Sequence, residues 1–283
     1  MNNEIAIIWD FDKTLIDGYM EEPLFKAYGV DSGLFWSESN ALPEKYLREQ
    51  GVKVNPETIY LNHILSYVKD GRFRGLNNAK LRELGGSLRL YPGVPEIFSL
   101  MREQIEGNPK YAEYGINVEH YIVSTGLTEM IMGTEVAPCV NGIWGCEFIE
   151  KDGEISEVGY TIDNTTKTRA LFEINNGERR VRFINMVYAA DRPSDIPAFS
   201  VVNKNYGATF AVYPRGDSKA LRQVEKMRRE GRVNMFAEAD YSEQSTACMW
   251  LSEKVREEAD RIREEERAKI KKYTAGWEVR HLS

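Results

Sequence analysis

The hydrophobic pattern of the chain opens with a short apolar run at residues 5–9, "IAIIW", which predicts a buried β-strand. Two carboxylates, Asp10 and Asp12, follow this run and flank one phenylalanine. Like charges held this close repel each other and lose hydration, so a fold keeps them together only with a compensating cation or a shared proton. The end of the first strand is therefore a candidate for chemistry.

Apolar residues are next spaced by three and four, a pattern that predicts helices and no convincing strand over residues 19–88. The segments "EEPLFKAYG", "PEKYLREQG" and "PETIYLNHILSYVKDG" each carry a proline near the start and a glycine near the end, as helix termini commonly do. We therefore predict a small all-helical unit inserted after the first strand.

Beyond residue 88 the pattern alternates between helix and strand. Strands are predicted in "NVEHYIVS", "RFINMVYAAD", "ATFAVYP" and "VNMFAEADY", and helices in "LYPGVPEIFSLMREQI", "NTTKTRALFEINNG", "PSDIPAFSVVN" and "SKALRQVEKMRREG". Such alternation implies crossover connections and a mainly parallel sheet with helices on both faces. The predicted fold class is α/β: a doubly wound, Rossmann-like sheet formed by residues 1–18 and 89–240.

Two turn signals, Asn141-Gly142 and Asp152-Gly153, lie in the strand-rich segment "CVNGIWGCEFIEKDGEISEVGYTI" and each predicts a β-hairpin. Cys139 and Cys146 bracket the first of these turns. Three cysteines are too few for a disulfide framework and lack zinc-site spacing, so we interpret all of them as reduced. A structural bridge between this pair is the less favoured alternative.

The C-terminal segment, residues 241–283, is predicted to be a long helix and tail. Its apolar stripe gives way to charges of mixed sign, and consists of Trp250, Leu251, Val255, Ala259 and Ile262. We interpret the first half as docked on the protein and the second half as solvated. A homodimer contact or a partner helix is the alternative interpretation.

Composition narrows the class of protein. With 283 residues, of which 42% are hydrophobic, the chain can bury a core of domain size. The net charge of −7 argues against a nucleic-acid partner, because binding the phosphate backbone needs a surplus of Lys and Arg. The chain shows no long uncharged apolar stretch and no basic signal-peptide start. We therefore expect no membrane span and a cytoplasmic location.

Chemistry-bearing residues follow the predicted strands and begin one of the helices. The group comprises Asp10, Asp12 and Thr14; Ser124, Thr125 and Gly126; Lys167; and Asp191 with Asp195. In doubly wound sheets ligands bind beyond the carboxyl ends of the strands. Carboxylates, hydroxyls, a lysine and free backbone N–H groups are together the ingredients of a divalent-cation and phosphate site.

This donor set suits phosphoryl transfer. Magnesium prefers oxygen ligands, and it would also explain why the acids can coexist. An ionised Asp10 could attack phosphorus, while Asp12 protonates the leaving oxygen and later activates water. Asp10 and Asp12 alone are also compatible with a polar strand end that caps a turn. Lys167 has the weakest signal, because Arg169 lies close by in the sequence.

The segments "DFDKT", "IVST" with Gly126, Lys167 at a helix start, and "AADRPSD" resemble the four motifs of the haloacid dehalogenase superfamily, phosphatase branch. This resemblance implies that Asp10 is the nucleophile and Asp12 the acid and base. It implies Mg²⁺ ligation by Asp10, Asp191 and the Asp12 backbone carbonyl, with Asp195 behind the metal. It further implies that Ser124 and Lys167 hold the phosphate, alongside the neighbouring Thr14, Thr125 and Gly126.

The position of the insert, residues 19–88, resembles the helical cap of the phosphoserine phosphatase group. Such a cap closes over small phosphoesters and excludes water. Two features depart from that group. Ala190 and Arg192 flank Asp191 where glycines are usual, so Arg192 is a candidate ligand contact. Tyr19 occupies the position expected for a glutamate that holds the substrate amino group, with Glu21 shifted along the chain.

The sequence therefore predicts a Mg²⁺-dependent phosphomonoester hydrolase that acts on a small soluble phosphorylated metabolite through an aspartyl-phosphate. A phosphomutase or phosphotransferase of the same fold would keep both acids and is the nearest alternative. A binding or scaffold protein that works through the C-terminal helix is the alternative from a different class.

Overall fold

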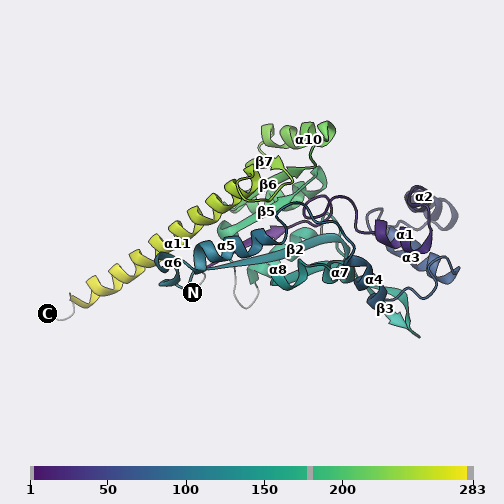
Figure 1. Ribbon diagram of the computed structural model, residues 1–283, viewed down its shortest axis with the longest axis horizontal. Helices are drawn as coiled ribbons and strands as arrows, with labels where there is room; N and C mark the ends of the chain where they lie inside the picture. Colours follow the sequence, from purple (N-terminus) through teal and green to yellow (C-terminus); the bar gives the residue numbers. More distant parts are fainter. Residues whose placement is uncertain (1–2, 177–180, 279–283) are drawn as a thin grey trace.

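The computed structural model describes residues 3–176 and 181–278 and contains a seven-stranded sheet (Figure 1). The strand order is β4-β3-β2-β1-β5-β6-β7, and every neighbouring pair is parallel except β3 with β4. The strands are β1 (Glu4–Trp9), β2 (Asn117–Leu127), β3 (Gly142–Lys151), β4 (Glu154–Tyr160), β5 (Met186–Ala190), β6 (Ala208–Tyr213) and β7 (Met235–Glu238). This arrangement confirms the predicted doubly wound, mainly parallel fold.

Helices cover both faces of the sheet. The helices are α1 (Glu22–Tyr28), α2 (Ser32–Gln50), α3 (Ile59–Lys69), α4 (Asn78–Gly85), α5 (Glu96–Glu106), α6 (Pro109–Ala112), α7 (Thr128–Met132), α8 (Lys167–Asn176), α9 (Ile196–Lys204), α10 (Ser218–Arg229) and α11 (Thr246–Glu278). One buried cluster joins α5 and α11 to one face of β1, and a second joins α8, α9 and α10 to the other. Burial on both faces explains why β1 is a continuous apolar run.

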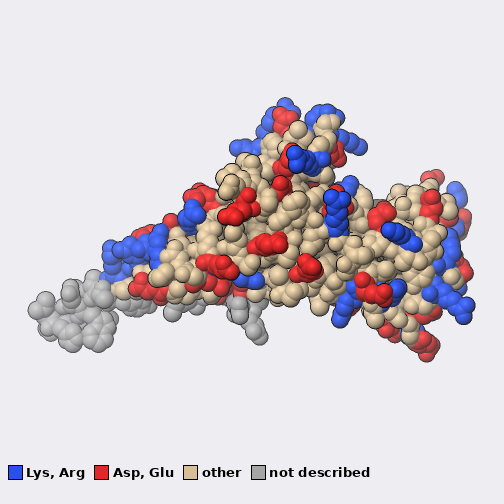
Figure 2. All heavy atoms as spheres, viewed as in Figure 1, with Lys and Arg blue, Asp and Glu red and all other residues tan. Residues whose placement is uncertain are grey.

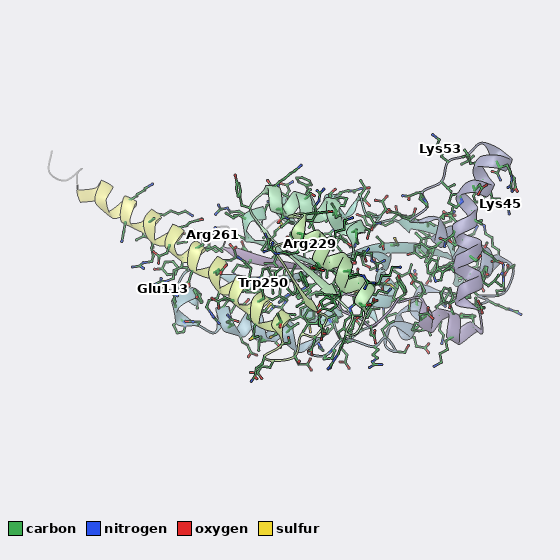
Figure 3. The ribbon with its side chains drawn as sticks, turned by 90° about the horizontal axis from the view of Figure 1, so that it is seen from above. Lys45, Lys53, Glu113, Arg229, Trp250 and Arg261 are labelled. Carbon is green, nitrogen blue, oxygen red and sulfur yellow. The ribbon has the colours of Figure 1, made fainter. Side chains whose placement is uncertain are left out.

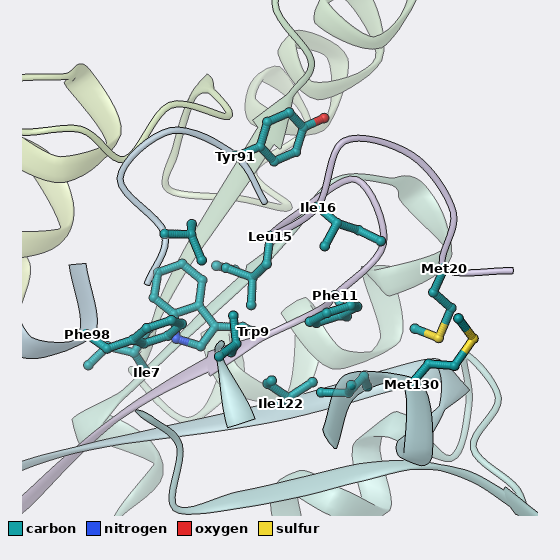
Figure 4. Packing of buried hydrophobic residues seen from close by; sticks show 14 of the residues in the cluster. Ile7, Trp9, Phe11, Leu15, Ile16, Met20, Tyr91, Phe98, Ile122 and Met130 are labelled. Carbon is teal, nitrogen blue, oxygen red and sulfur yellow. The ribbon is translucent and has the colours of Figure 1, made fainter. Parts of the chain in front are cut away.

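Strand β1 anchors the turn that carries the first two acids. Ile7 and Trp9 point into one cluster, whereas Ile8 points into the other. The Trp9 ring packs edge-on against Phe98 with ring centres 5.6 Å apart. Phe11 stays on the side of Trp9 and is fully buried (Figure 4). Burying each such ring contributes about 1.5–3 kcal/mol, so the chain is fixed between Asp10 and Asp12.

The insert is helical, as predicted, and α1, α2 and α3 lie together beyond one end of the sheet (Figure 1). Aromatic rings form its core, with Phe25 and Phe35 at 4.8 Å between ring centres. The sequence predicted a helix beginning near Pro43, but α2 begins at Ser32 and runs through this proline. Asp31 accepts a hydrogen bond from Leu34 N (2.6 Å), and this N-terminal cap sets the earlier start.

Helix α4 packs closely on α7 of the sheet domain. A Cβ atom built on Gly85 would lie 2.0 Å from the Met130 carbonyl oxygen, and one built on Gly133 would lie 1.8 Å from that of Arg82. Only glycine permits this approach of two backbones. One end of the insert is therefore joined firmly to the sheet domain, and the boundary at residue 88 stays a prediction.

One of the two predicted hairpins is present. Strands β3 and β4 pair antiparallel around Asp152-Gly153, whose φ angles are 54° and 84°. The hairpin predicted at Asn141-Gly142 is wrong, because β3 starts at Gly142 and pairs in parallel with β2. The Asn141 side chain instead accepts a hydrogen bond from His120 N (3.0 Å). The three cysteines are free, as expected.

The first half of α11 docks as predicted. Leu251, Val255, Ala259 and Ile262 are buried, and Trp250 stacks on Phe210 with ring centres 5.0 Å apart. Ile270, further along, is exposed. Figure 3 shows Trp250 and Arg261 on this helix, which extends away from the end of the molecule where Lys45 and Lys53 lie. A partner for this helix stays a prediction.

Charges of both signs are interspersed over the face shown in Figure 2. Within the described part of the chain, no helix combines the length and the apolar character needed to cross a membrane.

We expect Gly133→Ala to destabilise the protein, because the added methyl group would collide with the Arg82 carbonyl. Overpacking of this kind costs about 1–3 kcal/mol in the free energy of unfolding, measurable by urea denaturation. Glu83→Ala, at an exposed position of α4, is the control, because it adds no atom to the α4–α7 contact. Equal stability of the two variants would contradict this account of the α4–α7 contact.

Candidate active site

The central position of β1 brings three distant segments to one edge of the sheet. Trp9 pairs with Ile122 on β2 and with Ala189 on β5. The residues just beyond these pairs, Asp10 and Asp191 among them, therefore emerge side by side. Asp10 N also donates a hydrogen bond to the Ala189 carbonyl (2.9 Å). The strand order reverses at β1, which is where doubly wound sheets bind ligands.

Lys167 is the first residue of α8 and is fully buried. Its Nζ atom lies 2.9 Å from Asp10 Oδ1 and 2.7 Å from Asp195 Oδ1. The Tyr188 hydroxyl donates a second hydrogen bond to Asp195 Oδ1 (2.7 Å). Burial alone would lower the pKa of Lys167, but the two carboxylates raise it above its ordinary value. This lysine is therefore the positive centre of the site.

The local sequence fixes the start of α8. Asp163 Oδ1 accepts hydrogen bonds from Thr165 N (2.9 Å) and Thr166 N (2.6 Å). These bonds satisfy backbone donors that lack partners inside the helix. Lys167 follows at once, so its side chain leaves the helix where it can reach β1.

Burial raises the pKa of three acids at the site, Asp10, Asp12 and Asp191. The pKa of Asp10 rises because of burial, and the Lys167 ammonium opposes this rise. The pKa of Asp12 lies well above its usual range because of burial and the nearby charges of Glu21 and Asp10. Burial raises the pKa of Asp191 to about 6. Asp12 therefore holds a proton most readily and suits the role of an acid.

The carboxylates of Asp10, Asp191 and Asp195 could hold a metal ion. One oxygen from each lies within 4.8 Å of the others, and all three residues are buried. Carboxylate oxygens are the ligands that Mg²⁺ prefers, so the donor set fits this ion. The Asp12 side chain lies outside this group, so its predicted metal contact rests on its backbone carbonyl.

The residues whose hydroxyl groups are predicted to hold phosphate come from two segments: Ser124 and Thr125 lie near the end of β2, and Thr14 follows β1. Ser124 is buried, and its Oγ accepts a hydrogen bond from Gly126 N (3.1 Å). Thr125 faces the insert, because its carbonyl accepts a hydrogen bond from the Tyr60 hydroxyl (2.9 Å). Thr14 is buried, and its Oγ1 has no hydrogen-bond partner within the described ranges.

Gly126 also allows the insert to approach the sheet. A Cβ atom at this position would lie 2.2 Å from Met20 Cε. Met20 N in turn donates a hydrogen bond to Asp12 Oδ1 (3.1 Å). Figure 4 shows Met20 beside Met130 at the rim of the core. The predicted phosphate-binding glycine therefore has a packing role as well.

A cavity of about 320 Å³ opens beside Asp12. Residues of the sheet domain and of the insert form its wall together: Asp12, Thr125, Gly126 and Arg192, and Tyr19, Glu21, Trp36, Asn40, Glu57 and Tyr60. Its size and its mixture of aromatic and polar side chains suit a small, polar molecule.

Tyr19 and Glu21 both line the cavity, so the role predicted for the position of Tyr19 stays a prediction. Glu21, which the sequence showed shifted along the chain, is buried, and burial raises its pKa to about 7. Tyr19 is 39% exposed, and its ring lies 4.4 Å from Lys13 Nζ. Glu21 is therefore the more deeply buried of the two.

Arg192 lies in the cavity wall beside Asp191, and its contact with a ligand stays a prediction. Its Nε donates to Asp191 Oδ1 (2.8 Å), and its Cζ lies 5.6 Å from the centre of the Tyr19 ring. Burial alone would lower the pKa of Arg192, but the Asp191 and Asp10 carboxylates raise it. Arg192 is therefore a permanent positive charge in the cavity wall.

Solved structures of other proteins share this fold. A HAD family hydrolase from Salmonella enterica serovar Typhi superposes with a TM-score of 0.55 at 12% identity, covering 83% of this chain and 67% of its own. A phospho-aspartyl intermediate analogue of phosphoserine phosphatase gives 0.51 at 15% identity, covering 83% and 93%. The chain has the haloacid dehalogenase fold. The fold expected from the four sequence motifs is thus confirmed.

A sequence relative identifies the family more narrowly. An uncharacterized protein of Borreliella burgdorferi is 38% identical over 89% of this chain and 97% of its own length. The chain belongs to the same family as this protein. No protein-family model matches the chain. Because this relative is uncharacterized, it assigns no activity to the family.

We expect Lys167→Met to destabilise the protein strongly, because it leaves Asp10 and Asp195 buried beside each other without their cation. Removing one partner of a buried ion pair costs about 3–5 kcal/mol in the free energy of unfolding. Denaturant titration measures this loss. Lys219→Met, at an exposed lysine, is the control and should change stability little. Similar stability of both variants would show that the ammonium does not hold these acids in place.

Proposed function

We propose that the protein is a Mg²⁺-dependent phosphomonoester hydrolase that acts on a small phosphorylated metabolite through an aspartyl-phosphate on Asp10. One observation carries this proposal: the buried Lys167 ammonium contacts Asp10 while a second acid, Asp12, lines the adjacent cavity. A nucleophile, its charge partner and a proton donor thus lie at one sheet edge. The hydrolases and phosphatases that share the fold support the same conclusion.

Asp10 is the nucleophile in this proposal. Lys167 contacts Oδ1 and favours the ionised carboxylate against the effect of burial, which leaves the second oxygen to attack phosphorus. As the new O–P bond forms, the bond from phosphorus to the leaving alcohol breaks. Lys167 also lies where it can neutralise charge on the phosphoryl oxygens.

Asp12 transfers the proton in both half-reactions. Its raised pKa keeps a proton available, which it gives to the departing alkoxide. It then takes a proton from the water that attacks phosphorus, so that inorganic phosphate leaves and Asp10 is restored. The position of Asp12 in the cavity wall places the alcohol part of the substrate in the cavity.

A bound Mg²⁺ would polarise the phosphoryl group and reduce the repulsion among the acids. Asp10, Asp191 and the Asp12 backbone carbonyl would hold it, with Asp195 behind them. Asp195 already accepts hydrogen bonds from Lys167 and Tyr188, which suits a residue that orients its neighbours.

The alternatives make different predictions for the product. A phosphomutase would release an isomeric phosphoester, whereas a hydrolase releases inorganic phosphate. A scaffold protein has no need for buried acids around a buried lysine, because such groups are costly to keep.

We expect Asp10→Asn to lower kcat for p-nitrophenyl phosphate by about 10³-fold or more, because the nucleophile is lost. Asp12→Asn should slow the hydrolysis of alkyl phosphates by about 10²- to 10⁴-fold. It should slow the hydrolysis of p-nitrophenyl phosphate much less, because nitrophenolate leaves without a proton. Release of inorganic phosphate measures both rates. Asp17→Asn, at an exposed aspartate, is the matched control. An active Asp10→Asn variant would overturn the mechanism.

We also expect Mg²⁺ affinity to fall about tenfold between pH 7 and pH 5, because Asp191, with a pKa of about 6, must lose its proton to bind the ion. Calorimetric titration with Mg²⁺ at several pH values measures this change. Asp191→Asn should bind more weakly and should lose this part of the pH dependence. Equal Mg²⁺ affinity of the wild-type protein and the Asp191→Asn variant would exclude Asp191 as a ligand.

A further inference from the structure

Arg192 has hydrogen-bonding capacity that the ion pair with Asp191 does not use. Its Nε donates to Asp191 Oδ1, and the side chain remains 32% exposed. Neither Nη atom makes a hydrogen bond to any residue in the described part of the chain. The guanidinium lies near the Tyr19 ring, which limits its freedom. The four N–H groups on the Nη atoms of Arg192 are therefore held near one place and remain available to bind a ligand.

Arg192 is also the one cation among the described residues that line the 320 Å³ cavity. Lys167 is not part of this wall and is occupied by Asp10 and Asp195. The other charged residues of the wall are acids: Asp12, Glu21 and Glu57. An anionic group in the cavity therefore has one favourable position, against Arg192.

The alcohol part of a substrate must enter this same cavity, since Asp12 protonates the leaving oxygen from its wall. A planar guanidinium with free Nη groups binds a carboxylate or a phosphate through two parallel hydrogen bonds. Such a contact selects among phosphoesters by the alcohol part and not by the phosphoryl group that all of them share.

We propose that Arg192 is a specificity-determining residue, and that it binds a second anionic group, a carboxylate or a phosphate, on the alcohol part of the substrate. This inference rests on the proposed function, because it assigns the cavity to the leaving group of a phosphomonoester. It narrows the substrate class to small phosphomonoesters that carry another anion.

Matched ligand pairs test this inference. One pair is 3-phosphoglycerate and glycerol 3-phosphate; the other is 2-phosphoglycolate and 2-hydroxyethyl phosphate. Members of a pair have similar size and differ by one carboxylate. Calorimetry with the Asp10→Asn protein and Mg²⁺ measures binding without turnover. We expect the carboxylate-bearing member of at least one pair to bind roughly tenfold more tightly, as a charge-assisted bidentate contact provides.

Arg192→Gln in the same background should reduce this preference to about twofold or less, because it removes the charge and the planar fork. Arg192→Lys should keep part of it. Lys219→Gln is the control, because Lys219 lines a neighbouring cavity with Arg192 but not this one.

An equal preference with and without Arg192 would overturn the inference, as would the absence of a preference or of binding in both pairs. A loss in Lys219→Gln as large as in Arg192→Gln would also overturn it, because the general field of the surface would then explain the preference. The proposed function fails separately, if the wild-type protein releases no phosphate from any ester while Arg192 still discriminates within the pairs.

Discussion

The site depends on one buried ammonium group placed between two carboxylates. Lys167 joins Asp10, at the end of β1, to Asp195, which follows β5, and all three side chains are withdrawn from water. Without this cation, the sheet order that aligns β1 with β5 would hold buried acids against each other. The parallel sheet provides proximity, and the lysine makes that proximity tolerable.

The positive charge of Lys167 compensates the buried acids only in part, and this affects their protonation. Lys167 is shared by two carboxylates, and Asp191 depends on Arg192 at the cavity wall. Burial consequently raises the pKa values of Asp10, Asp12 and Asp191. Buried acids with raised pKa values stabilise the fold poorly. They are, however, suited to cation binding and to proton transfer near neutral pH. The local instability is offset by the two hydrophobic clusters on either face of β1.

The sequence was informative where the chemistry depends on strand ends. The apolar strands before Asp10 and Asp191 were enough to bring these two acids together, because parallel strands end at one edge. Lys167 begins a helix, and the resemblance to the family motifs assigned it to the same site. The sequence did not predict contacts between the backbones of different elements. The contact of Gly85 with α7 and the inward turn of Glu21 depend on tertiary packing that no local pattern records. The hairpin predicted at Asn141 was wrong for the same reason, because the Asn141 side chain accepts a hydrogen bond from the neighbouring strand.

The insert and the buried Lys167 are not structurally independent. Asn55 Nδ2 donates to Asp163 Oδ2 (2.8 Å), and Glu57 Oε2 accepts a hydrogen bond from Asn164 N (2.7 Å). Asp163 also holds the first turn of α8, at which Lys167 begins. Glu57 lines the cavity as well. The same short loop thus forms part of the cavity wall and contacts the start of the helix that places the ammonium beside Asp10. The position of the insert and the position of Lys167 are therefore linked through two hydrogen bonds.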